Sequence, residues 1–250
     1  MEKLKCIVSY DGSQFSGFQI QPHKRTVQAE VEEALKRMHK GQAIRIHSSG
    51  RTDKGVHARG QVFHFETSLH IPAARWEKAL QALLPNDIEI IEVTSVSASF
   101  HARFDAVEKE YRYYILNRDK RDVFTRNYMY FERDKLNMEK LVAACKQFEG
   151  THDFTTFSSA RASVKGSRVR TLHEVNATKT DDVIEIIFRG DGFLYHMVRI
   201  IIGVILDVAK GKLMPSDIES LFKAKSREKV GMTMPPEGLY LWHVTYKEND

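Results

Sequence analysis

Strand and helix patterns follow each other in a similar order in both halves of this chain, and that order most constrains its fold. Alternating or short apolar runs indicate strands, and apolar residues at helical spacing indicate helices. In the first half these patterns predict strands over 4–10, 44–47, 61–65 and 87–96, and helices over 27–38 and 76–84. In the second half they predict strands over 111–116, 183–188 and 239–246, and helices over 138–148, 195–209 and 215–223.

This order predicts an α+β chain with two related subdomains, residues 1–104 and 105–250, joined near Phe104 to Glu110. With 250 residues and 42% hydrophobic content, the chain is long enough to bury a substantial core. The pattern leaves open whether the two subdomains share one sheet or form separate sheets.

Composition narrows the class of protein. Lys and Arg number 38 against 33 acids, a net charge of +5 that suits nucleic-acid contact. The eleven histidines show no paired Cys/His or HExxH spacing, which argues against a metal site. Cys6 and Cys145 lie in apolar patterns and are expected to be core thiols. The N-terminus has no signal-peptide shape, and the apolar run 193–206 is too short to span a bilayer. We therefore expect a reduced, soluble, cytosolic protein.

The segment 48–60, SSGRTDKGVHARG, carries the clearest chemical signal. It holds a single carboxylate, Asp53, among Arg51, Lys54 and Arg59, and its three glycines permit sharp bends. Flanking cations favour the ionised carboxylate. The run predicts a bent, basic loop that presents one nucleophilic or basic carboxylate to a polyanionic substrate. Its alternative is a solvated turn in which the aspartate bonds its own backbone.

Three further segments carry weaker signals. Arg199 is the only residue of formal charge in the apolar run 193–206, so its guanidinium is expected to be buried and to need a partner from elsewhere. Tyr111 lies on a predicted strand beside basic residues, where an aromatic ring either packs in the sheet or stacks on a base. Leu239 follows a Pro-Pro turn and would form an apolar wall if that loop borders a pocket.

The segment 158–170 is basic and contains no acid. Its cations are Arg161, Lys165, Arg168 and Arg170. Such a run is either a solvated loop or a flexible clamp for phosphate groups, and the sequence favours neither interpretation.

Taken together, these segments resemble the tRNA pseudouridine synthases of the TruA type, nearly from end to end. The motifs that carry the resemblance are YDGSQFSGFQIQP with RTVQ (10–28), GRTDKGVHARGQV (50–62), LPNDI (84–88), FHARFDA (100–106), KEYRYYI (109–115), GDGFLYHMVRIIIG (190–203) and PPEGLYL (235–241). Their number, order and spacing make the match specific. Lys54 departs from the family pattern, in which Ala is more usual, and it adds a positive charge beside the aspartate.

The resemblance implies an isomerase that converts uridine to pseudouridine at positions 38, 39 and 40 of the tRNA anticodon stem-loop, without cofactor or metal. It assigns Asp53 as the catalytic aspartate and Tyr111 as the tyrosine that stacks on the target base. Arg199 would pair with the aspartate, Arg51 would help to hold the flipped nucleotide, and Leu239 would be a pocket wall. It also implies a curved mixed sheet of two related subdomains and a homodimer that binds tRNA across both subunits.

Two other functions fit parts of the sequence. A non-catalytic RNA-binding or RNA-chaperone module would use the basic and aromatic residues but has no need of Asp53 together with Arg199. A metal-dependent nuclease would need several clustered acids to hold Mg²⁺, and the basic loop supplies only one. The sequence also leaves the route of isomerisation open between attack on C1′, attack on C6 and elimination from C2′.

Overall fold

The computed structural model describes residues 1–159 and 166–247, and the chain divides into two compact units. Unit 1 holds residues 1–107 together with the C-terminal strand from Tyr240 onward, and unit 2 holds Glu108–Leu239. The sequence predicted two consecutive subdomains, 1–104 and 105–250. The observed division differs in the placement of the last strand, which belongs to unit 1. That strand returns to unit 1 because Tyr240 and Leu241 pair with residues 57 and 58 there.

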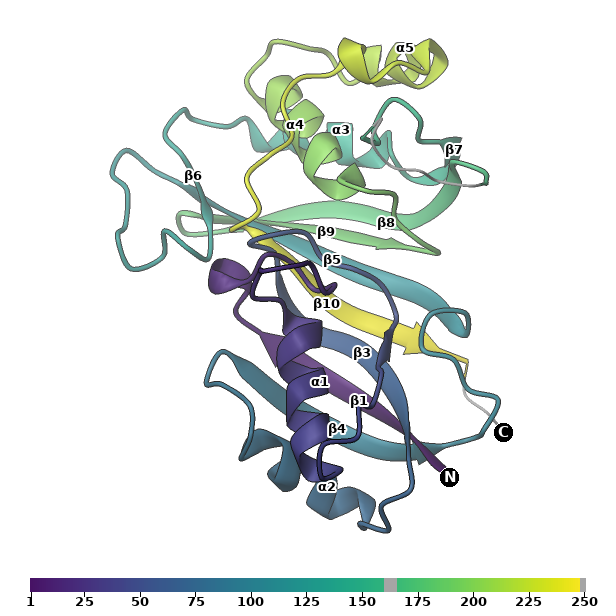
Figure 1. Cartoon of the computed structure of the whole chain (residues 1–250). Coiled ribbons are helices and arrows are strands. Elements are labelled where there is room, and N and C mark those ends of the chain that lie inside the picture. Colours follow the sequence, from purple (N-terminus) through teal and green to yellow (C-terminus); the bar gives the residue numbers. More distant parts are fainter. Residues whose placement is uncertain (160–165, 248–250) are drawn as a thin grey trace. The chain divides into compact units, whose positions relative to one another are not determined.

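Unit 1 is a sheet with two helices. Its described elements are β1 (Glu2–Tyr10), η1 (Gly12–Gln14), α1 (Val27–Met38), β2 (His47–Ser48), β3 (His57–Thr67), α2 (Ala73–Gln81), β4 (Ile88–Val96) and β10 (Leu239–Tyr246). β1 lies between β4 and β3 and is antiparallel to both, and β10 runs parallel to β3 (Figure 1). Every second residue of β1, including Leu4, Cys6 and Val8, is fully buried, as one packed sheet face requires.

The strands of unit 2 pair mostly antiparallel, with helices on one side. Its described elements are β5 (Ala106–Asn117), which begins at the boundary, β6 (Tyr130–Glu132), α3 (Met138–Lys146), β7 (Gly150–Asp153), β8 (Val169–Thr180), β9 (Val183–Gly190), α4 (Met197–Ala209), α5 (Asp217–Ala224) and η2 (Arg227–Lys229). The strand order is β5-β9-β8-β7, and β6 pairs parallel with β5. Figure 1 shows α3 and α4 side by side over β8 and β9, and α4 is buried along most of its length.

These elements confirm the predicted α+β class, with mostly antiparallel strands. The strand predicted over 44–47 is wrong, because regular pairing is confined to β2. Ile44 and Ile46 are buried as expected, but they pack from an irregular segment. The N–H of Ile46 donates to the Glu32 carboxylate of α1 at 3.1 Å, so a side chain replaces the strand partner that the apolar alternation implied.

The predicted loop over 48–60 is shorter in the structure. β3 begins at His57, four residues earlier than expected, because Ala58 pairs with Tyr10 of β1 and with Leu241 of β10. Gly60 therefore lies in a strand, where a Cβ would come within 2.6 Å of the Trp242 carbonyl oxygen. The glycine is needed for close packing of strands rather than for a turn.

The basic segment 158–170 is only partly a loop. Arg161 and Lys165 lie outside the described residues. Arg170 belongs to β8 and pairs with His152 of β7. The strands β6, β7 and β8 were not predicted, because their sequences lack clean alternation. Cys6 and Cys145 are both buried free thiols, which confirms that prediction.

Candidate active site

Asp53 lies in a tight turn between β2 and β3 of unit 1. Its carbonyl oxygen accepts a hydrogen bond from the N–H of Val56 at 3.1 Å, which closes the turn. The segment after η1 holds the turn from outside, since the N–H of Phe18 donates to the Thr52 carbonyl at 3.1 Å and the N–H of Gly55 donates to the Phe15 carbonyl at 3.3 Å. The Asp53 side chain is partly exposed. The turn thus presents its carboxylate on a backbone fixed at both ends.

Two glycines of the YDGSQFSGF motif allow this close approach. A Cβ on Gly12 would lie 2.1 Å from the Val56 carbonyl oxygen, a distance that no side chain tolerates. A Cβ on Gly17 would lie 2.9 Å from the Thr52 carbonyl oxygen, and its φ of +100° also favours glycine. The two motifs at 10–18 and 50–62 are therefore one structural feature in which the first supports the second.

Buried polar side chains hold the turn from beneath. The hydroxyl of Tyr10 bonds to Thr52 Oγ1 at 2.8 Å, and both residues are buried. Burial raises the pKa of Tyr10, so its hydroxyl stays protonated. On the other side, Ser49 Oγ donates to Gln61 Oε1 at 2.6 Å, and Gln61 Nε2 donates to the Gly50 carbonyl at 3.1 Å. The sequence alone indicates no role for these four side chains, because only tertiary contact reveals it.

The cationic side chains in and after the turn have different surroundings. Arg51 and Lys54 are exposed in the turn itself. Arg59 lies on β3, with its guanidinium over the Trp242 ring at 5.8 Å, so it packs on an aromatic face. His57, fully within the core, accepts the Gly12 N–H at 3.0 Å and stacks on the Tyr240 ring at 4.6 Å. We find that His57 supports the turn, a role that the sequence analysis missed.

In unit 2, Tyr111 lies on β5 opposite Phe188 of β9. Its ring is partly exposed and meets Phe193 edge-on, with centroids 4.9 Å apart. Tyr113, two residues on along the same face, is fully buried. The two tyrosines thus differ in burial. Tyr113 packs in the core, and Tyr111 keeps an accessible ring that can stack on a base.

Arg199 lies in the first turn of α4 and is half-buried rather than fully buried. Its Nε donates to the Met234 carbonyl at 2.6 Å, and its own carbonyl accepts the Met234 N–H at 3.1 Å. These bonds tie α4 to the segment that follows η2. A main-chain carbonyl therefore accepts one of the hydrogen bonds that the guanidinium can donate. The carboxylate partner expected from the sequence stays a prediction.

Leu239 ends the segment 234–239, which runs between α4 and β5. The hydroxyl of Tyr113 donates to the Pro235 carbonyl at 2.9 Å, and the N–H of Tyr114 donates to the Gly238 carbonyl at 2.9 Å. Leu239 itself is 4% exposed, and its N–H closes a turn onto Pro236 at 2.9 Å. One segment thus links Arg199 and the tyrosine strand to the position of Leu239 within unit 2.

The residue before α4 also has an unusual backbone that the sequence did not signal. His196 has a φ of +62°, in the left-handed region, and its ring stacks on Tyr195 with centroids 3.8 Å apart. A non-glycine residue in this region costs free energy, and such residues cluster at functional sites. This conformation sets the direction of α4 relative to the preceding segment, which contains Phe193.

Two absences apply to the described part of the chain. Over residues 1–159 and 166–247, no group of three or more His, Cys, Asp and Glu side chains could hold a metal ion. Within the same ranges, no helix is long and apolar enough to cross a membrane.

Comparisons with known proteins identify the family of this chain. A family model described as tRNA pseudouridine synthase matches residues 6–105 and 144–247, so it covers both units. Among curated proteins, tRNA pseudouridine synthase A of Oceanobacillus iheyensis is 56% identical over 249 residues, covering 100% of this chain and 98% of the relative. The Bacillus subtilis protein of the same name is 50% identical, covering 98% of this chain and 99% of the relative. The fold and the match define an RNA-modifying isomerase, and the chain belongs to the tRNA pseudouridine synthase family.

Proposed function

We propose that this protein isomerises uridine to pseudouridine at positions 38, 39 and 40 in the anticodon stem and loop of tRNA. The observation that carries the proposal is the fixed turn that presents Asp53, in a chain that belongs to the tRNA pseudouridine synthase family over both of its units. The reaction breaks the N1–C1′ bond, rotates the detached base and joins C5 to C1′, while C5 loses a proton and N1 gains one. It needs no redox partner, because the product is an isomer of the substrate.

We assign the catalytic role to Asp53. Attack on C1′, attack on C6 and assistance of elimination from C2′ all require an ionised carboxylate, which neighbouring cations favour. A turn closed by the Val56 N–H and braced by Phe15 and Phe18 holds that carboxylate in one place. Preorganisation of this kind lowers the cost of reaching a reactive geometry.

We assign substrate binding to Tyr111, Arg51, Arg199 and Leu239. A uridine in a stacked stem must be extruded before it can react, and an aromatic face offers it a replacement for the lost stacking. The accessible ring of Tyr111 supports this role, and the exposed Arg51 can bind a phosphate. Arg199 would favour the carboxylate form of Asp53, and the buried Leu239 would keep the detached uracil from water.

The decisive experiment measures tritium release from tRNA transcripts labelled at C5 of uridine, in the presence of EDTA. Wild-type protein is expected to release tritium, and Asp53→Asn is expected to release none while it still binds tRNA. A filter-binding assay on both proteins is the control for folding. Release by Asp53→Asn at the wild-type rate would refute the catalytic assignment, and loss of wild-type release in EDTA would refute a metal-free reaction.

We also propose that the protein works as a cytoplasmic homodimer with tRNA across both subunits. The expectation follows from family membership. Light scattering on the purified protein at micromolar concentration is expected to give twice the mass of the 28.8 kDa chain. A monomer mass at concentrations where the enzyme is active would contradict it.

A further inference from the structure

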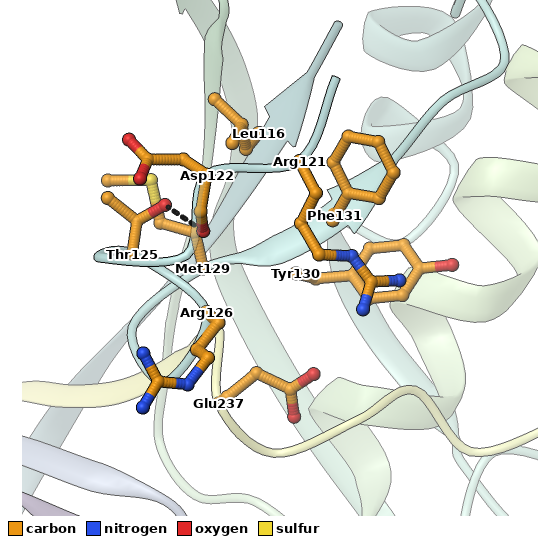
Figure 2. A pocket seen from close by; sticks show the side chains of 9 residues that line it. All are labelled: Leu116, Arg121, Asp122, Thr125, Arg126, Met129, Tyr130, Phe131 and Glu237. Atoms are coloured by element: carbon orange, nitrogen blue, oxygen red, sulfur yellow. Dashed lines mark hydrogen bonds between the residues drawn. The ribbon is translucent and has the colours of Figure 1, made fainter. Parts of the chain in front are cut away.

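A small pocket lies in unit 2 beneath the loop that joins β5 to β6. It has a volume of about 110 Å³. It is lined by Leu116, Arg121, Asp122, Thr125, Arg126, Met129, Tyr130, Phe131 and Glu237 (Figure 2). None of the residues proposed above for catalysis or substrate binding lines it. The pocket is therefore a separate feature of unit 2.

Two opposite charges at this pocket have no bonding partner among the described residues. Arg121 is exposed, and its described interaction is a cation–π contact with the Phe131 ring at 5.2 Å. Glu237 is half-buried and makes no hydrogen bond or ion pair with any residue in 1–159 or 166–247. Figure 2 shows the two side chains extending into the pocket from opposite sides. A guanidinium and a half-buried carboxylate left without partners leave hydrogen-bonding capacity for a ligand.

The charge of Glu237 acts inside the pocket. Burial and the nearby carboxylates of Glu132 and Glu237 raise the pKa of Tyr130, although Lys210 opposes them. The Tyr130 ring and the Phe131 ring also give the pocket aromatic surface. The site therefore combines a cation, an anion and aromatic faces in a small space.

The loop above the pocket has an unusual surface. Phe124 is 86% exposed and Val123 is 58% exposed, between Arg121 and Arg126. Arg126 donates to the Val123 carbonyl, which holds its side chain along the loop. Exposed aromatic residues interleaved with arginines are typical of surfaces that bind single-stranded nucleic acid, where bases stack and phosphates pair with cations.

The size of the pocket favours part of a polymer over a whole small molecule. Pockets for small molecules usually hold roughly 300 to 1,000 Å³. The volume of about 110 Å³ lies well below that range. One base edge fits such a space when the rest of the nucleotide remains outside it.

We propose that this pocket binds one nucleotide of the tRNA substrate other than the uridine that is isomerised. Arg121 donates to the phosphate of that nucleotide, and Glu237 accepts an N–H from the edge of its base beside Tyr130. The inference rests on the proposed function, since it takes the RNA substrate from there. A site of this kind would fix the register of the RNA while another nucleotide reacts.

The test compares binding of a fluorescent tRNA transcript by Arg121→Ala, Glu237→Gln and wild type at several salt concentrations. Arg37→Ala is the matched control, because Arg37 is an exposed arginine of α1 in unit 1 whose side chain makes no described hydrogen bond or ion pair. Arg121→Ala is expected to raise the Kd about tenfold and to reduce the slope of log K against log salt by about 0.7 to 0.9, the value for one lost phosphate contact. The control is expected to keep the wild-type slope.

Glu237→Gln distinguishes a hydrogen bond between Glu237 and a base from electrostatic repulsion between Glu237 and the RNA. If Glu237 accepts a base N–H, the variant weakens binding about threefold to tenfold with an unchanged salt slope. If Glu237 only repels RNA, the variant tightens binding, and this result would overturn the proposal. An Arg121→Ala slope equal to that of Arg37→Ala would do the same. Wild-type tritium release is measured in parallel, so that failure of the isomerase assignment is seen separately from failure of this pocket.

Discussion

Asp53 owes its position to residues that lie far from it in the sequence. Tyr10 and Thr52 share a buried hydrogen bond of 2.8 Å beneath the turn. Gly12 lies against the carbonyl of Val56, which is 44 residues further along the chain. These contacts are individually small. Together with the main-chain bonds of Phe15, Phe18 and Val56, they fix the backbone that carries the carboxylate.

At the residue scale, we predict that Thr52→Val destabilises the protein by about 1 to 3 kcal/mol. The substitution keeps the shape of the side chain but leaves the buried Tyr10 hydroxyl without its Thr52 partner. Urea unfolding followed by circular dichroism measures the loss. Thr125→Val, at a partly exposed threonine, is the control and is expected to change stability by less than about 0.5 kcal/mol. Equal stability of Thr52→Val and wild type would show that the bond contributes nothing.

Gly12→Ala should be more damaging, because its new Cβ would lie 2.1 Å from the Val56 carbonyl oxygen. We expect a loss of more than about 2 kcal/mol and a large fall in tritium release, since the backbone must move away from the Asp53 turn. Gly41→Ala is a useful comparison. That glycine has a φ of +96° but open space around it, so its substitution costs strain without a clash. A milder effect for Gly12→Ala than for Gly41→Ala would contradict the steric argument.

At the scale of elements, α4 connects Arg199, which we propose binds substrate, to the segment 232–239 of unit 2. Arg199 in its first turn bonds Met234, and one turn later Gly203 meets the carbonyl oxygen of Met232. A Cβ on Gly203 would come within 2.8 Å of that oxygen. The helix and the segment 232–239 therefore form one packed layer.

Gly203→Ala has two opposite effects on the stability of the protein. Alanine in a helix interior favours the helix by roughly 0.5 to 1 kcal/mol over glycine. The clash with a main-chain carbonyl is larger, so we predict net destabilisation and reduced kcat, because the segment that carries Leu239 shifts. Thermal unfolding and tritium release both report on this change. A raised Tm with unchanged activity would show that the segment yields without cost.

At the scale of the whole molecule, three histidines of unit 1 predict a pH dependence of stability. His64 is buried, and its Nδ1 accepts the Ala102 N–H at 3.1 Å. Burial, together with the neighbouring His101 and His47, lowers the pKa of His64 from 6.5 to about 4. In the unfolded chain the same imidazole gains its proton near pH 6.5. Between these values the unfolded state binds more protons, so stability is lost as the pH falls through that window.

We therefore expect the urea concentration at the unfolding midpoint to decrease as the pH is lowered from about 6.5 to about 4. His64→Asn keeps an acceptor for the Ala102 N–H without a titrating ring, and it is expected to flatten the profile in that window. In unit 2, the ion pairs of Glu110 contribute at lower pH, since Arg112 and Arg189 lower the pKa of Glu110 despite its burial. A profile for His64→Asn that parallels the wild type would place the dependence elsewhere.

The sequence by itself indicated the α+β class and the family, and it singled out the residues that we propose for catalysis and substrate binding. Periodicity is local, so it indicated β1, α1, α4 and β10 within a few residues of their bounds. It failed where tertiary contacts replace local ones. Ile46 satisfies its N–H through Glu32, and the unpredicted β7 and β8 pair with each other across 15 intervening residues.

Only the tertiary structure decided how the site is built. Tyr10, Gln61 and His57 became supports of the Asp53 turn because the chain brings β1 and β3 together, which no spacing encodes. The pocket of Arg121 and Glu237 likewise joins residues more than 100 positions apart. Local patterns specify secondary structure because they depend on neighbouring residues. A site depends on contacts between distant segments, and these are fixed only when the whole chain packs.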